Sequence, residues 1–355
     1  MSRNSYQSAV EYRSENIEFL RETLCSLRAL CAKKFVSTQS TQRFHGVSRS
    51  IRFSPTGLKN LRETHLVILL LVCFFSLSAC RSANQSAPAE VKMRDIADDL
   101  GRPIKIPEKV ERVVSLAPNL TENIFAVGAG DRLVGVTKFC NYPEDAQKIQ
   151  QVGDTLNPNI ETIIALKPQI VFVSTASQLE TFMKTLEAQG ITVFVTNPKD
   201  LNGVLANLRQ LGEIFGTPER TTILLNELQE RIIAVDEQTR DKPKIKTFVQ
   251  ISKEPLFTIG KESFLTEIIE RAGGVSVTNT VATAYPKISK ETALALNPDA
   301  IILSESPDNT EPNEVFKNSP AVKNKKVFKI NADILSRPSP RLVDALEQIA
   351  EALVK

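Results

Sequence analysis

The sequence predicts an α/β protein of two similar Rossmann-like lobes, each with a mainly parallel sheet, joined by one long α-helix. Short apolar, β-branched runs alternate with helical patterns along the chain. Two sequence motifs each occur twice in the same order, and a long helical pattern lies between the two occurrences. We therefore expect a ligand cleft between the lobes, at the carboxyl ends of their strands.

An export signal is expected before the lobes. Leu66 to Ala79 is an uncharged run of 14 residues that follows a basic stretch, and it is too short for an ordinary membrane-spanning helix. It ends in Leu77-Ser78-Ala79-Cys80, which resembles the lipobox of bacterial lipoproteins, so we expect Cys80 to carry a lipid anchor. The alternative is a plain signal-anchor with an incidental cysteine. Both place the globular part outside the cytoplasm.

Residues 1–79 are thus expected to be a signal region. Its long polar start is most simply explained by a mis-assigned or extended N-terminus. Residues 80–93 include the small, polar stretch Arg81 to Glu90, which predicts a flexible tether between the lipid and the first lobe.

The N-terminal lobe is predicted over residues 94–217. Its expected strands are Arg112 to Leu116, Ile170 to Val173 and Thr192 to Val195. Its expected helices are Leu120 to Val127, Gln178 to Gln189 and Leu201 to Phe215. Each helix is followed by a glycine, at position 128, 190 or 216, which is typical of a helix C-terminus.

Residues 218–243 are expected to form the connecting helix. Pro218 is suited to a first helical turn, and Leu225, Leu228, Ile232 and Val235 make one apolar stripe. A continuous helix from Glu219 to Arg240 would span about 33 Å. One helical strut predicts little closure of the lobes.

The C-terminal lobe is predicted over residues 244–355. Its expected strands are Thr247 to Ile251, Ala300 to Leu303 and Lys326 to Ile330, and its expected helices are Phe264 to Ala272 and Pro340 to Val354. We expect the acid Asp333 and the base Arg337 to lie in a loop stiffened by two prolines.

Two internal repeats support lobes of similar topology. The pattern Glu-Thr-x-x-Ala-Leu-x-Pro starts at Glu161 and recurs 130 positions later at Glu291. The pattern Leu-Thr-Glu-x-Ile starts at Leu120 and recurs 145 positions later at Leu265. Both keep their order along the chain.

Composition disfavours several function classes. Residues 80–355 contain no histidine, which removes Ser-His-Asp and Cys-His catalysis and imidazole-based zinc or manganese sites. No dinucleotide-binding or phosphate-binding glycine motif is present. This part has 33 Lys and Arg against 36 Asp and Glu, so its charge does not suggest nucleic-acid binding. Lipidation of Cys80 would leave Cys140 alone, without a disulfide partner. An enzyme would have to rely on carboxylates.

Two tyrosines are candidate ligand contacts. Tyr142 and Tyr285 each precede a proline in a predicted loop, one in each lobe, where the proline restricts the backbone and so sets the angle of the ring. The alternative is two half-buried loop tyrosines.

Polar and rigid segments near strand ends are further candidates. Residues 115–119, which include Ala117, Pro118 and Asn119, close the first strand and open a helix, so backbone N–H groups and the Asn119 side chain are expected to face the cleft. Asn119 as a structural cap is the alternative. Asp333 and Arg337 follow the last strand, where Arg337 can donate to ligand oxygens or form an ion pair with Asp333.

Two exposed acids are candidate docking residues. Glu161 and Glu291 stand in the first turns of equivalent helices, where the helix dipole favours a carboxylate. Their equivalent positions also suit a two-fold symmetric partner.

Six segments together resemble the substrate-binding lipoproteins of ABC importers for cobalamin and ferric siderophores, and they are most similar to the cobalamin-binding branch. The resemblance covers residues 96–353. The segments are Val114 to Glu122, Asn141 to Pro143, Asn159 to Pro168, Pro255 to Ser263, Ala284 to Ser289 and Ser336 to Leu342.

The resemblance implies roles for particular residues. Tyr142 would lie against the corrin, Phe257 and Tyr285 would add aromatic wall, and Asp333 to Arg337 would contact the ligand from the second lobe. Glu161 and Glu291 would dock onto arginines of a dimeric permease. Where cobalamin binders often carry tryptophan, this chain has Leu156 or a neighbour, and Ser174.

We therefore expect a monomeric, lipid-anchored receptor without a cofactor, which captures cobalamin or a related corrinoid and delivers it to an ABC permease dimer with its ATPase subunits. A ferric siderophore, or haem bound through a tyrosine, is the alternative ligand. A carboxylate-based enzyme or a sensory domain on the same fold is the alternative class.

Overall fold

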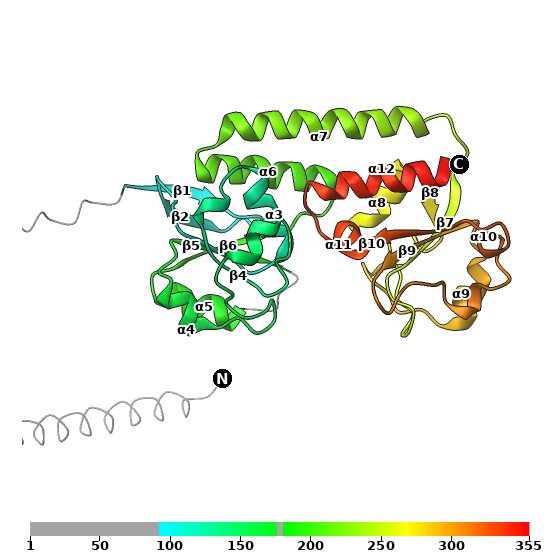
Figure 1. Cartoon of the computed structure of the whole chain (residues 1–355), viewed down its shortest axis with the longest axis horizontal. Coiled ribbons are helices and arrows are strands. Elements are labelled where there is room, and N and C mark those ends of the chain that lie inside the picture. Colours follow the sequence, from blue (N-terminus) through cyan, green and yellow to red (C-terminus); the bar gives the residue numbers. More distant parts are fainter. Residues whose placement is uncertain (1–91, 176–179, 355) are drawn as a thin grey trace, which may run out of the picture. The chain divides into compact units, whose positions relative to one another are not determined.

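The computed structural model describes residues 92–175 and 180–354 (Figure 1). Residues 88–355 form one compact unit, separate from residues 1–87. The expected signal region, the lipidation of Cys80 and the tether up to residue 91 lie outside the described residues, as do the first two residues of the helix expected at 178–189. No helix of the described part is long and apolar enough to cross a membrane.

Two four-stranded parallel sheets organise the described residues and confirm the predicted α/β class. The N-terminal sheet has the order β4-β3-β5-β6 and the C-terminal sheet the order β8-β7-β9-β10. The two orders are equivalent along the chain, as the internal repeats predict. The strands are β3 (Val113–Ser115), β4 (Leu133–Val136), β5 (Ile170–Ser174), β6 (Thr192–Thr196), β7 (Ile245–Gln250), β8 (Gly274–Ser276), β9 (Ala300–Glu305) and β10 (Val327–Asn331).

An antiparallel hairpin precedes the first sheet. Strands β1 (Met93–Ala97) and β2 (Pro103–Pro107) pair with each other, and the buried Asp98 at their turn accepts hydrogen bonds from the Arg102 side chain and from the Val195 amide at 3.3 Å. The hairpin is thereby tied to β6 of the N-terminal lobe.

Helices of the N-terminal lobe agree closely with their predicted ranges. Gly128, Gly190 and Gly216 follow three of them with φ of 84°, 74° and 68°, the left-handed conformation that ends a helix at low cost for glycine. The helices, including short 3₁₀ turns, are α3 (Pro118–Ala126), η1 (Gly130–Arg132), η2 (Glu144–Lys148), α4 (Ile160–Ala165), α5 (Glu180–Ala188) and α6 (Leu201–Phe215).

Helix α7 (Pro218–Thr239) is the predicted connecting helix of 22 residues. Its apolar stripe at Leu225, Leu228, Ile232 and Val235 is buried. Figure 1 shows it lying along one side of both lobes. Arg231 binds Asp344 and Glu347 of α12 (Arg341–Val354), so α7 is also held by ion pairs to the second lobe.

Helices α10 (Pro320–Lys323) and α11 (Ala332–Ser336) of the C-terminal lobe were not predicted from the sequence. Asp333 and Arg337 were expected in a loop, which is wrong for Asp333: Ala332–Ser336 form helix α11. The Asn331 side chain accepts a hydrogen bond from the Asp333 amide at 2.9 Å and caps this helix. The other helices are α8 (Phe264–Arg271), α9 (Lys290–Leu296), η3 (Glu314–Phe316) and α10 (Pro320–Lys323).

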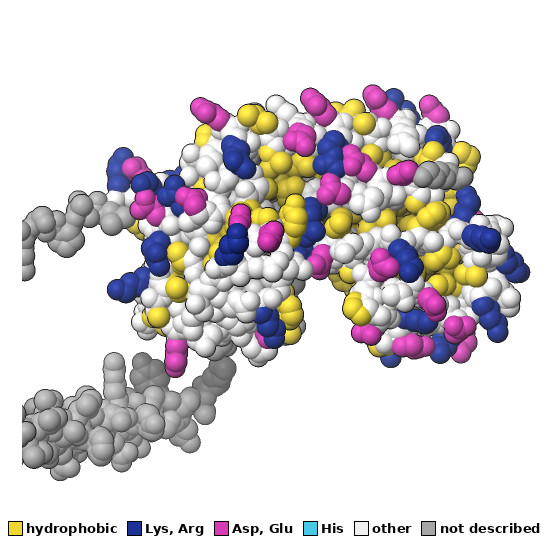
Figure 2. Space-filling view, viewed as in Figure 1, with side chains coloured by type: hydrophobic (Ala, Val, Ile, Leu, Met, Phe, Trp, Pro, Cys, Tyr) yellow, Lys and Arg dark blue, Asp and Glu magenta, His cyan; other side chains and the backbone are white. Residues whose placement is uncertain are grey.

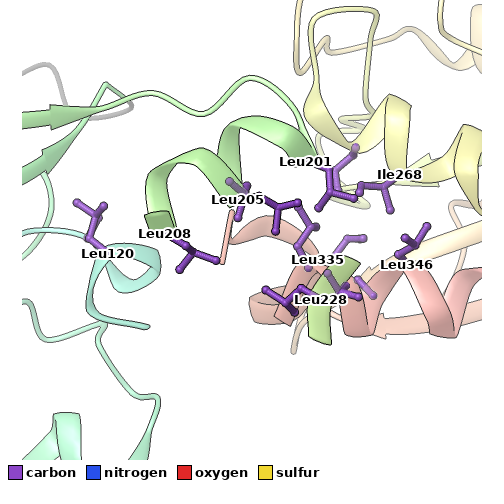
Figure 3. Close-up of a cluster of buried hydrophobic side chains, with 14 of the residues drawn as sticks. Leu120, Leu201, Leu205, Leu208, Leu228, Ile268, Leu335 and Leu346 are labelled. Atoms are coloured by element: carbon purple, nitrogen blue, oxygen red, sulfur yellow. The ribbon is translucent and has the colours of Figure 1, made fainter. Parts of the chain in front are cut away.

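One hydrophobic core runs through both lobes. Its buried side chains include Leu120 and Leu208 of the first lobe, Leu228 of α7, and Ile268 and Leu346 of the second lobe (Figure 3). Opening the lobes widely would expose this shared apolar surface to water, which is unfavourable. We therefore expect the cleft to be largely preformed.

Candidate functional site: the interlobe cleft

The cleft lies between the lobes on the side away from α7, where Figure 2 shows the molecule hollowed. A cavity of about 540 Å³ occupies it. Residues from both lobes line it, and several directly follow the carboxyl ends of β5, β6 and β7, where α/β folds commonly bind ligands. The lining residues are Asn119, Ser174, Thr175, Asn197, Pro198, Lys199, Ile251, Glu262, Ser263, Phe264, Leu265, Ala284, Tyr285, Ser336 and Pro338.

The N-terminal wall begins where β3 turns into α3. Pro118 occupies the first helical turn, Ala117 is buried, and Asn119 lines the cavity. The Ser115 hydroxyl donates to the Ala117 carbonyl at 3.0 Å, and the Thr121 hydroxyl donates to Ser115 at 2.8 Å. These buried hydrogen bonds hold the start of α3 against the cleft.

The C-terminal wall is the repeat equivalent of that turn. Adding 145 to positions 117–119 gives Glu262, Ser263 and Phe264, all of which line the cavity. Ser263 caps α8 by accepting a hydrogen bond from the Leu265 amide at 3.3 Å. Sequence reasoning did not select these three residues, although the repeat could have located them.

Tyr285 projects from the loop that was predicted to hold it. Its neighbour Ala284 accepts a hydrogen bond from the Gly260 amide at 2.9 Å, and a Cβ at Gly260 would lie only 2.0 Å from the Thr283 carbonyl oxygen. Only glycine therefore permits this close approach. Phe257 is half-buried and pairs with Ser252 and Lys287 in isolated β-bridges, so it supports the same loop.

The Tyr285 phenol is held neutral. Burial raises its pKa above the ordinary 10.0, although a hydrogen bond with Ser263 acts in the opposite direction. The side chain is still 43% exposed, because part of it faces the open cleft. A neutral phenol can both donate and accept hydrogen bonds to a ligand.

Titration of the phenol checks this environment. In a spectrophotometric titration, the ultraviolet absorbance of the Tyr285→Phe variant is subtracted from that of the protein. The difference should show an ionisation midpoint above pH 10.0, since burial disfavours the phenolate. A midpoint at or below that value would mean that the hydroxyl is fully solvated.

Tyr142 lies at the junction of the lobes. It is 48% exposed, and the Arg341 guanidinium lies 4.1 Å from its ring centroid in a cation–π contact. Tyr142 lines a second cavity of about 330 Å³ together with Phe125, Arg220 and Arg341. A bound ligand can reach the exposed part of the ring, but the ring does not line the main cavity.

Asp333 and Arg337 form the ion pair that was one of the two sequence interpretations, at 2.7 Å. Arg337 also donates to Asn141 Oδ1 at 2.7 Å and to Glu122 Oε1 at 2.9 Å. The Arg337 side chain is 11% exposed. The guanidinium of Arg337 therefore connects the two lobes. A ligand could be bound only by the part of this side chain that these bonds leave free.

Glu161 and Glu291 are both exposed in the first turns of α4 and α9. The preceding caps are equivalent: Asn159 accepts from the Thr162 amide at 2.9 Å, and Ser289 accepts from the Thr292 amide at 3.1 Å. Hydrogen bonds from its own backbone amide and from Ser289 lower the pKa of Glu291, which keeps it charged near neutral pH.

An exposed leucine accompanies each of these acids. Leu294 is one helical turn after Glu291 and is 60% exposed, whereas Leu156 precedes α4 and is 67% exposed. Figure 1 shows α4 and α9 at the ends of the lobes that lie away from α7. The acids are thus at equivalent positions of the two lobes, whereas the exposed leucines are not.

A further cavity adjoins the cleft on the side of α8. It measures about 780 Å³ and shares Lys199, Glu262, Ser263, Phe264 and Ala284 with the main cavity. Space for a bulky ligand therefore extends beyond the main cavity.

The chain was compared with known proteins. A family model described as periplasmic binding protein matches residues 113–334. A Vitamin B12-binding protein of Vibrio vulnificus (strain YJ016) is 30% identical over 246 residues, which cover 68% of this chain and 89% of that protein. A protein of Bacillus subtilis (strain 168) named uncharacterized ABC transporter substrate-binding lipoprotein YvrC is 28% identical over 302 residues, 80% of this chain and 95% of that protein.

Solved structures show the same fold. The periplasmic vitamin B12 binding protein BtuF of Vibrio cholerae matches with a TM-score of 0.61 and 29% identity, over 70% of this chain and 98% of that one. The periplasmic heme-binding protein RhuT from Roseiflexus sp. RS-1 also matches with a TM-score of 0.61, at 23% identity and over 69% and 98% of the two chains.

Proposed function

The chain belongs to the periplasmic binding protein family, and we propose that it is an extracytoplasmic receptor of an ABC importer that captures cobalamin or a related corrinoid and delivers it to the permease. The relatives at 30% identity that are named vitamin B12-binding proteins support the ligand. The observation that carries the proposal is the open interlobe cleft, to which both lobes contribute the start of a helix and the carboxyl ends of strands.

The cleft can hydrogen-bond a large ligand with amide side chains, and its charged lining residues are Lys199 and Glu262, of opposite sign. Asn119, Asn197, Ser263 and Tyr285 offer neutral donors and acceptors, and Phe264 adds an aromatic surface. We expect binding with little movement of the lobes, because the core beneath the cleft is shared. A preformed site avoids the free-energy cost of ordering on binding.

Haem or a ferric chelate is the second candidate ligand, because Tyr285 places a phenol in the cleft and a phenolate can coordinate haem iron. The relatives at 30% identity that are named vitamin B12-binding proteins make the corrinoid the preferred ligand.

Attachment to the membrane forms part of the proposal. The relative YvrC carries the word lipoprotein in its name, and Cys80 follows a lipobox-like segment in this chain. We propose that a lipid on Cys80 holds the receptor at the membrane surface, so that a captured ligand stays near the permease.

Coelution with coloured ligands tests the ligand class. The purified protein is mixed in turn with cyanocobalamin, hemin and a ferric hydroxamate, and is separated from free ligand by gel filtration. We expect cyanocobalamin to travel with the protein and the other two to separate from it. Coelution of hemin or the ferric hydroxamate alone would support the second candidate. If the protein is folded and none of the three ligands coelutes with it, both candidate ligand classes are contradicted.

A further inference from the structure

A single buried carboxylate lies where the two lobes meet. Glu122 of α3 is 3% exposed and accepts hydrogen bonds from three side chains of the second lobe. Arg337 donates to its Oε1 at 2.9 Å, and Ser339 and Arg341 donate to its Oε2 at 2.7 and 2.9 Å. Both oxygens are thus occupied by groups that lie more than 200 positions away along the chain.

Two of these partners of Glu122, Arg341 and Arg337, contact residues that are predicted to bind the ligand. Arg341, which is fixed by Glu122, lies over the ring of Tyr142. Arg337, which is also fixed by Glu122, binds Asp333. Asn141 completes the connection, because its Nδ2 donates to Asp333 at 2.8 Å while its Oδ1 accepts from Arg337.

The second lobe uses its equivalent glutamate differently. Glu267 is the repeat counterpart of Glu122, and it also bonds across the lobes, since its Oε2 accepts from the Leu201 amide at 3.0 Å. Its charged partner is Arg271 of its own helix, at 2.8 Å. Neither Leu201 nor Arg271 contacts a predicted ligand residue. Both glutamates therefore form hydrogen bonds between the lobes. Of the two, Glu122 is the one that binds arginines next to the predicted ligand contacts.

From this arrangement we infer that Glu122 is a positioning residue for ligand binding: through Arg341 it sets the angle of Tyr142, and through Arg337 it sets the position of Asp333. Both of its oxygens already accept hydrogen bonds from protein side chains, so it acts through these residues. Charge-assisted hydrogen bonds in a buried site are strong and directional, and one carboxylate thereby aligns contacts that come from opposite lobes. This inference rests on the proposed function for its ligand.

The first test needs no ligand. The full chain contains four tyrosines, and fluorotyrosine labelling gives each one a fluorine NMR signal, of which Tyr142→Phe identifies one. In Glu122→Gln the Tyr142 signal should shift as Arg341 leaves the ring, while the Tyr285 signal stays in place. Glu347→Gln removes a partner of Arg231 and is the control, in which both signals should stay. An unmoved Tyr142 signal in folded Glu122→Gln would overturn the inference.

A second variant covers the case in which Glu122→Gln does not fold. Arg341→Lys leaves Glu122 paired with Arg337 but removes the planar group from the Tyr142 ring. It should shift the same fluorine signal. If it folds and the signal does not move, the link from Glu122 to Tyr142 through Arg341 is absent.

The second test uses cyanocobalamin. Glu122→Gln should weaken binding by about tenfold, or about 1.4 kcal/mol, because Tyr142 and Asp333 are no longer held in their positions. In a Tyr142→Ala, Asp333→Ala background the same change should alter affinity less than about twofold. An equal loss in both backgrounds would indicate a merely structural role. If the parent chain itself binds no ligand, the proposed function fails, and the fluorine signals still decide the inference.

Discussion

Reversing Glu161 and Glu291 to lysine together should abolish permease-dependent uptake and leave ligand affinity unchanged. Each acid is exposed in the first turn of an equivalent helix. If the permease offers arginines to both, as the family resemblance implies, two attractive contacts become repulsive. Juxtaposed like charges cost several kcal/mol at an interface, which corresponds to a loss of more than about a hundredfold. Uptake of labelled ligand into cells that lack the native receptor measures the effect.

Its control is a reversal of equal charge elsewhere. Glu227 and Glu230 are exposed on α7, so Glu227→Lys, Glu230→Lys carries the same net change of charge on a different surface. It should support normal uptake. If the first pair transports as well as this control, Glu161 and Glu291 do not dock the permease.

Replacing Phe172 by alanine should strongly lower the free energy of unfolding. Phe172 is fully buried in β5, with its ring centroid 5.4 Å from that of Phe194 and 5.9 Å from that of Phe215. Phe172→Ala removes these contacts and leaves a cavity, which typically costs about 3–5 kcal/mol. Denaturant unfolding followed by circular dichroism measures the change.

The same substitution at the exposed Phe139 is the control for Phe172→Ala. It is 51% exposed, so Phe139→Ala should change the free energy of unfolding by less than about 0.5 kcal/mol. Similar losses for the two variants would contradict the placement of Phe172 in the core. Because β5 carries Ser174 and Thr175 into the cleft, folded Phe172→Ala should also bind ligand more weakly.

Periodicity and helix-ending glycines predicted most of the fold. Helix α6 has the predicted bounds, and α7 (Pro218–Thr239) is shifted by one residue at each end from the continuous helix expected from Glu219 to Arg240. The elements that were missed are short. Strand β8 spans only Gly274–Ser276, and such a length shows no period. Helix α11 depends on the cap from Asn331, which a stretch rich in prolines obscured.

The site was predicted only in part. Asn119 and Tyr285 line the cleft, as expected, and the contacts assigned to Tyr142, Phe257, Asp333 and Arg337 stay predictions. Residues 262–264 could have been found by carrying residues 117–119 through the repeat.

Glu122 could not have been selected from the sequence. Within its own helix it is one more acidic residue, and its role depends on tertiary contacts with residues more than 200 positions away. Such contacts depend on how the lobes pack, which local patterns do not specify.

Calorimetric titration with cyanocobalamin measures whether the protein binds a corrinoid. We expect one site per chain and a dissociation constant below about 10 μM, which corresponds to a binding free energy stronger than roughly −7 kcal/mol. Folded protein that shows weaker binding, or none, would contradict the assignment of a corrinoid to this cleft.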